Sequence, residues 1–272
     1  LVDSIKKAAT KRMLDSLKDL KTNSFDKYKE FWNEYGLVLK EGPAEDHENK
    51  ETIASLMLFA STFSNNNSVN QSLDDYVGRM KSDQDKIYFC VADTYEAAVN
   101  SPHIEGLKSK GIEVILLTDR IDEWLMAGLM EYQGKELVNA AKEEVVEEDS
   151  KKKIPEADQD IVNKIKKHLD NKVSDVVISS RLTDSASCIV LPKHEPGAQL
   201  RKILEASGQS LGSSNPIFEI NMKHKLVKKL KDLKGKQFNS YIDFLYDYAV
   251  IAEGGSPQDP SKYLRQLDKY LS

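Results

Sequence analysis

The sequence has few cysteines and no long apolar run. Of its 272 residues only Cys90 and Cys188 are cysteines, and both lie inside short strand-like segments. The longest apolar runs, such as IEVILL, are far shorter than the roughly 20 residues that a helix needs to cross a bilayer. Two cysteines far apart in apolar segments favour buried, reduced thiols over a disulfide. We therefore expect a cytoplasmic protein that does not span or bind a membrane.

The sequence also lacks the common motifs of nucleotide, metal and nucleic-acid sites. Neither G-x-x-x-x-G-K-[ST] nor G-x-G-x-x-G occurs, and the five histidines are not spaced as metal ligands on one helix. The formal net charge is −5 with both signs interspersed, so no basic field points to nucleic acid. We expect no cofactor, no metal and no catalytic residue in this chain.

One motif supports an alternative, a serine hydrolase. GQSLG, residues 208–212, fits the G-x-S-x-G pattern around a nucleophilic Ser210. That chemistry needs a strand before the serine and a helix after it. The pattern here predicts a helix before Ser210 and a strand after it, which favours a helix end and a loop.

The first half of the sequence changes period near residue 83. Helical stripes over 4–21, 24–35, 51–63 and 72–80 predict a helical bundle over 1–82. In the part that follows, 83–139, near-continuous apolar runs at 86–93 and 111–119 flank a helical segment. This order predicts two parallel strands in a small αβα lobe. Gly134 and KELVNAA are expected to close it as an edge strand.

The second half is predicted to be a separate domain. Residues 140–157 alternate charge blocks and suggest a solvated connector. Over 158–272 we expect a mixed α+β domain. KVSDVVISSRL and ASCIVL should form a hairpin, NPIFEIN a further strand, and 237–252 and 260–271 two closing helices. The fold class is therefore α/β and α+β, ending in a helical hairpin.

The segment DRIDEWLMAGLMEY, residues 119–132, raises a question of exposure. As a helix it buries Ile121, Leu125, Gly128, Leu129 and Tyr132 on one side. Trp124, Met126 and Met130 then lie off that side. Either these side chains form an adaptable binding surface, or another lobe covers them. Spacing alone favours the covered alternative.

The closing hairpin is apolar around most of its circumference, which suggests pairing with a second copy. The alternative is a core within one chain. The predicted dimer residues are Tyr241, Ile242, Leu245, Tyr248, Ala249, Leu264, Leu267 and Leu271.

Several stretches, in order along nearly the whole chain, carry a family resemblance. They include FWNEYGLVLKEGPAED, DYVGRMK, SPHIEGLKSKGIEVILLTDRIDEW, RLTDSASCIV and IAEGGSPQDP. Together they resemble the heat-shock protein 90 chaperone family, most closely its bacterial high-temperature protein G branch. GIEVILLTDRIDEW is the strongest single piece.

The resemblance implies that residues 1–139 are the later part of the middle domain and 158–272 the C-terminal dimerisation domain. The chain starts at Leu1 without an initiator Met, so we expect a piece of a longer protein whose ATP-binding domain lies elsewhere. The resemblance implies a stress-response chaperone, a homodimer that binds non-native clients, with other chaperones as further candidate partners. This piece should not bind ATP, and a pure dimerisation scaffold is the remaining alternative.

The family also suggests where clients bind. Glu123 and Trp124 match its client-binding pair, while Ala127 replaces a polar residue. A second client element maps onto PGAQLRKIL, with its apolar side on Leu200, Ile203 and Leu204. With Met126 and Met130, these residues form the predicted client-binding set.

Overall fold

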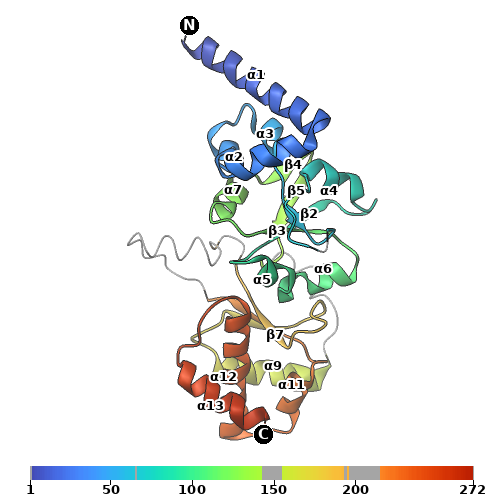
Figure 1. Ribbon diagram of the computed structural model, residues 1–272. Coiled ribbons are helices and arrows are strands. Elements are labelled where there is room, and N and C mark those ends of the chain that lie inside the picture. Colours follow the sequence, from blue (N-terminus) through green and yellow to red (C-terminus); the bar gives the residue numbers. More distant parts are fainter. Residues whose placement is uncertain (1, 65, 143–154, 193–194, 196–214, 272) are drawn as a thin grey trace. The chain divides into compact units, whose positions relative to one another are not determined.

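The computed structural model describes the chain except residues 1, 65, 143–154, 193–194, 196–214 and 272 (Figure 1). It divides into two compact units. Unit 1 contains Leu1–Val91 and Glu113–Val138, and unit 2 contains Ala92–Ile112 and Asn139–Ser272. Residues 92–112, the crossover between the two predicted parallel strands, thus belong to unit 2, whereas the sequence analysis assigned them to the lobe 83–139 of the first half. The domain limits themselves stay predictions.

Unit 1 opens with helices, as predicted. They are α1 (Val2–Asn23), α2 (Phe25–Glu45), α3 (Lys50–Leu56) and α4 (Leu73–Arg79). Helix α2 is longer than expected, because it continues through a buried Pro43 that stands only two residues from its end. A proline inside a helix lacks the N–H that would bond to the carbonyl four residues back, and its ring clashes with that carbonyl, so a helix seldom continues far beyond it.

The helix ends show which local signals were informative. Ser72 and Asp75 form a capping box: the Asp75 N–H donates to the Ser72 hydroxyl at 3.2 Å, and the Ser72 N–H donates to the Asp75 carboxylate at 3.0 Å. Ser24 occupies the N-cap position of α2, but its side chain makes no capping hydrogen bond. Helix α3 ends at Leu56 rather than Phe63, since the following residues join the sheet.

The sheet of unit 1 has five strands in the order β1-β3-β2-β5-β4. Their bounds are β1 (Ala60–Ser61), β2 (Lys86–Val91), β3 (Val114–Leu117), β4 (Glu131–Tyr132) and β5 (Lys135–Asn139). β2 and β3 pair in parallel, which confirms the predicted pair. β5 is not an edge strand, because Gln133 and Gly134, at φ 48° and 70°, turn β4 back onto it.

The crossover between β2 and β3 consists of α5 (Tyr95–Val99), η1 (Pro102–Ile104) and α6 (Glu105–Ser109). The Glu105 carboxylate accepts backbone N–H groups of Thr183 and Asp184 at 2.7 and 2.9 Å. Arg181 donates to the His103 carbonyl at 2.9 Å. These bonds explain why the crossover packs as part of unit 2.

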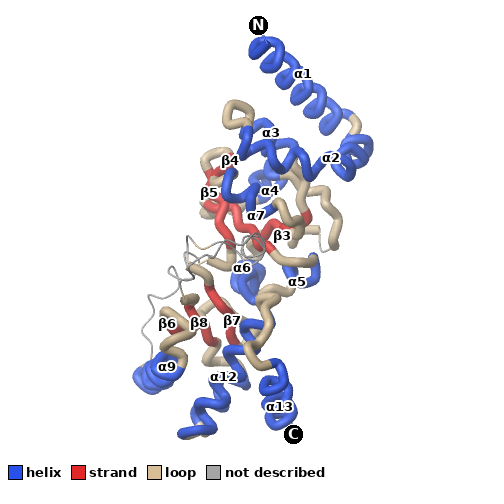
Figure 2. Tube along the Cα trace, turned by 90° about the vertical axis from the view of Figure 1, so that its left-hand side faces the viewer, coloured by secondary structure: helices blue, strands red, loops and turns tan. Residues whose placement is uncertain are grey.

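Unit 2 is a mixed α+β structure, as predicted. Its further elements are α9 (Glu156–His168), β6 (Asp175–Ile178), β7 (Ser187–Val190), β8 (Ile217–Ile220), α11 (Lys225–Lys228), η2 (Lys229–Lys231), α12 (Gly235–Ala252) and α13 (Pro260–Leu271). The predicted hairpin of β6 with β7 is wrong, because β8 lies between them, parallel to β6 and antiparallel to β7 (Figure 2).

A buried ion pair joins this sheet, through Glu219 of β8, to the loop residue Arg181. Arg181 and Glu219 are almost fully buried and meet at 2.7 Å. Burial works to raise the pKa of Glu219, but the Arg181 guanidinium outweighs it and holds that pKa low. Burial raises the pKa of the nearby Cys188 thiol. Both cysteines are buried thiols outside any disulfide, which confirms the prediction from the sequence.

Candidate functional site

Helix α7 (Asp122–Gly128) carries the predicted client-binding side chains of unit 1. Leu125 and Leu129 are buried in the core, which confirms the predicted inner side. Trp124 is 55% exposed and Met130, just beyond the helix, is 66% exposed. Ala127 is exposed as well. Within unit 1, an aromatic ring and a thioether therefore face outward.

Met126 does not belong to this surface. It is only 8% exposed, so the expectation that it points outward is wrong. It stands one turn after Asp122, and Asp122 is itself fully buried. The buried side of α7 is therefore broader than a stripe of apolar residues indicates, because it includes a charged position.

Asp122 is buried because Lys40 of α2 reaches it. The Lys40 ammonium lies 2.6 Å from carboxylate oxygens of both Asp122 and Asp119. The second oxygen of Asp122 accepts the Asp119 N–H at 2.8 Å. Burial raises the pKa of Asp122 despite the opposing effect of Lys40. This pairing fixes the start of α7 on α2.

A close approach at the other end of α7 completes this attachment. A Cβ added to Gly128 would lie 3.2 Å from the Cα of Ala44 on α2. This distance is tighter than ordinary van der Waals contact. Glycine at this position therefore lets the two helices pack closely, and α7 is held on α2 at both ends.

Helix α2 adds exposed apolar residues that the sequence reasoning missed. Tyr35, Leu37 and Val38 are 56%, 58% and 63% exposed. The buried side of α2 runs through Tyr28, Trp32, Gly36 and Lys40 at four-residue spacing. Tyr35, Leu37 and Val38 fall outside this spacing, so helical periodicity could have predicted that they are exposed.

The predicted dimer residues divide into two groups. Tyr241, Ile242, Leu245 and Ala249 are at most 1% exposed within one chain. Helix α12 packs on β7 and α9, so the chain's own core covers the side that was expected to await a partner. The expectation that the apolar side of α12 needs a second copy to bury it is therefore wrong for these four residues.

The second group remains accessible. Leu264 on α13 is 57% exposed and Ile251 at the end of α12 is 41% exposed. Tyr248 and Leu267 are partly buried. The Leu271 side chain lies outside the described residues. Exposed apolar side chains are thus found on α13 and at the end of α12.

Hydrogen bonds hold this hairpin in place. Asp243 of α12 accepts from His168 of α9 at 2.8 Å and from Lys262 of α13 at 2.9 Å. Although burial opposes it, these two partners lower the pKa of Asp243. The orientation of α13 is therefore fixed by a charge-assisted contact in addition to apolar packing.

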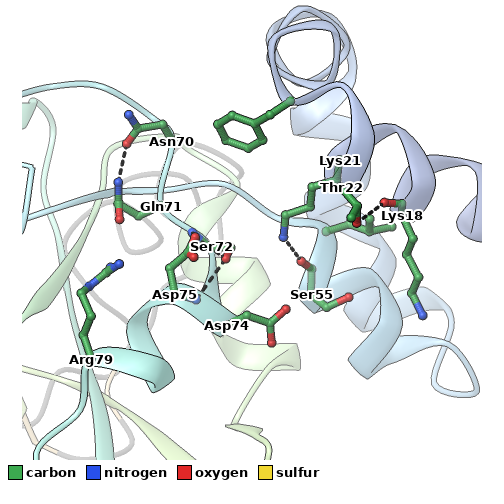
Figure 3. A pocket seen from close by; sticks show the side chains of 12 residues that line it. Lys18, Lys21, Thr22, Ser55, Asn70, Gln71, Ser72, Asp74, Asp75 and Arg79 are labelled. Atoms are coloured by element: carbon green, nitrogen blue, oxygen red, sulfur yellow. Dashed lines mark hydrogen bonds between the residues drawn. The ribbon is translucent and has the colours of Figure 1, made fainter.

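A pocket of about 710 Å³ lies elsewhere in unit 1, between the end of α1 and the start of α4 (Figure 3). Its polar groups bond to one another: Lys21 donates to the Ser55 carbonyl, and Ser72 pairs with Asp75. Arg79 on its wall pairs with Glu113 at 2.8 Å. None of the predicted site residues lines it.

Other predicted residues fall where nothing is described. Leu200, Ile203 and Leu204 of the second client element, and Ser210 of GQSLG, lie outside the described residues. Across the described ranges, three or more histidine, cysteine or acidic side chains never gather as a metal site would require. In the same ranges every helix is too short or too polar for a membrane span.

Comparison with known proteins identifies the family. A family model described as Hsp90 protein matches residues 1–272. The chain is 43% identical to Chaperone protein HtpG of Legionella pneumophila (strain Lens) over 99% of this chain and 44% of that protein. It is 43% identical to Chaperone protein HtpG of Colwellia psychrerythraea over 100% of this chain and 43% of that protein. The chain thus spans less than half the length of these relatives. The predicted resemblance is confirmed, and the chain belongs to the heat-shock protein 90 family.

Proposed function

We propose that this chain binds non-native client proteins and forms a homodimer, as part of a chaperone. The observation that carries the proposal is Trp124, an exposed indole on a helix that Lys40 and Gly128 attach firmly to α2. A large, rigid aromatic group offers much contact area at low entropic cost. The named function of the relatives, chaperone proteins, supports the same reading.

The mechanism is reversible binding without bond making. Trp124 and Met130 contact exposed apolar groups of an unfolded chain, and the flexible Met130 adapts to different sequences. Each contact is weak. Two copies of the surface in a dimer would hold one client with higher avidity than either copy alone.

Dimerisation is proposed through Leu264 and Ile251, with the partly buried Tyr248 and Leu267 at the margin. The fully buried residues of α12 belong to the core on which Tyr248 and Leu267 pack. We propose further that this chain acts in the cytoplasm and neither binds nor hydrolyses ATP. Nucleotide-dependent control would then belong to other parts of the longer relatives.

The test is the substitution Trp124→Arg. It should weaken suppression of a test client's aggregation by at least about tenfold, since truncating an anchoring Trp typically costs about 2 kcal/mol or more and each 1.4 kcal/mol is tenfold. Met13→Arg is the matched control, because Met13 is a 67% exposed apolar residue of the same unit on α1. The proposal fails if both variants protect the client equally, or if Trp124→Arg unfolds the chain.

A further inference from the structure

The exposed charges beside α7 are mainly acidic. From Phe31 to Glu45, helix α2 carries Glu34, Glu41 and Glu45 on its exposed surface. Its one basic residue in that range, Lys40, is buried and paired. On the segment that carries α7, Glu123 is partly buried and Glu131 is exposed, while Arg120 is the exposed basic residue. An unfolded segment approaching Trp124 therefore meets a field of negative sign.

Two contacts give the register between the helices. Lys40 meets Asp122 at 2.6 Å, and Ala44 lies close to Gly128, so α7 packs on the side of α2 that carries Lys40 and Ala44. Trp124 stands one turn before Gly128 and on the same side of α7.

The matching positions on α2 follow from the same helical spacing. Glu41 lies three residues before Ala44, and Leu37 lies four residues before Glu41. We therefore expect the indole of Trp124 to project alongside these two side chains. On this register we expect exposed apolar side chains, bordered by carboxylates, to extend from α7 onto α2.

We propose that this strip, Trp124 with Leu37, Glu34 and Glu41, extends the client surface onto α2 and selects client segments that combine apolar residues with lysine or arginine. The inference rests on the proposed function. Apolar groups supply most of the affinity, and complementary charge supplies the preference and faster association. Segments rich in acidic residues would be repelled by the same carboxylates.

The experiment compares two unfolded, fluorescein-labelled peptides with equal length and equal apolar content. One carries lysines at the positions where the other carries glutamates. We expect fluorescence anisotropy at low salt to give about tenfold tighter binding of the lysine peptide. Glu34→Gln with Glu41→Gln should reduce this ratio to about twofold, since each exposed pair contributes up to about 1 kcal/mol.

A matched control removes the same charge elsewhere. Glu156→Gln with Asp170→Asn alters two exposed acids of unit 2 and should leave the ratio unchanged. Added salt should shrink the preference of the unmodified chain, because exposed charges are screened over about 10 Å at 0.1 M. Equal affinities for the two peptides, or equal effects of the two double variants, would overturn the inference.

Two single variants separate this inference from the function on which it rests. Leu37→Ser should weaken both peptides about threefold without changing their ratio, as an exposed apolar contact does. Trp124→Arg should weaken both peptides strongly. If Trp124→Arg weakens both but Leu37→Ser and the glutamate variants change nothing, client binding stands and its extension onto α2 fails. If Trp124→Arg leaves both peptides unaffected, both proposals fail.

Discussion

Helices α7 and α12 were both predicted to present apolar residues to a partner, and they differ in what their own chain covers. On α7, Trp124 stays 55% exposed because the helix has only seven residues and packs on one broad side. On α12, Tyr241 and Leu245 are almost fully buried by the sheet and by neighbouring helices. Apolar circumference alone therefore does not distinguish a binding surface from a core that is enclosed on several sides.

The attachment of α7 offers the largest expected effect. Lys40→Ala removes the partner of a carboxylate that is 0% exposed, and breaking a buried pair from one side typically costs about 4 kcal/mol. Urea unfolding followed by tryptophan fluorescence checks this in unit 1, which contains both tryptophans, Trp32 and Trp124. The control Lys7→Ala removes an exposed pair with Glu48 and should leave the free energy of unfolding nearly unchanged, because exposed ion pairs are screened by water and salt.

The same variant carries a pH signature. Because the pKa of Asp122 is raised in the folded chain, its ionisation lowers stability as pH rises from the unfolded pKa to the folded one. Removing Lys40 raises that folded pKa further. The cost of Lys40→Ala should therefore be larger at about pH 8 than at about pH 5. An equal cost at both pH values would mean that Asp122 gains access to water.

The closing hairpin should separate stability from assembly. Leu245→Ala should destabilise unit 2 by about 3 kcal/mol, seen by circular dichroism, because it leaves a cavity in a packed core. Leu264→Arg should change stability by less than about 0.5 kcal/mol yet yield monomers by light scattering. Gln159→Arg, an equal charge change at an exposed site of α9, should remain dimeric. A Leu264→Arg dimer would place the interface elsewhere.

Much of the fold could be predicted where the signal is local. The capping box of Ser72 and Asp75 depends on residues three apart, and the parallel pair β2 and β3 depends on two long apolar runs. The hairpin of β6 with β7 failed because β8, about thirty residues further on, pairs with both. Strand order depends on which strands pair across long distances in the sequence, and a local hydrophobic pattern does not specify that pairing.

The candidate site shows the same limit. Trp124 and Met130 could be placed off the core by helical spacing. Met126 could not, because its burial follows from Asp122, whose partner Lys40 stands 82 positions earlier. A charged residue in a helix is ordinarily assigned to solvent, and only the tertiary ion pair reverses that assignment.

The most direct test of the account is the environment of Trp124 with and without a client. In a Trp32→Phe variant Trp124 is the one remaining tryptophan, and its emission should be red-shifted, as for an indole in water. Adding an unfolded client should shift this emission to the blue, while buried Trp32 in a Trp124→Phe variant should not respond. Blue emission from Trp124 in the free chain, or no shift with a client that the chain protects from aggregation, would contradict the account.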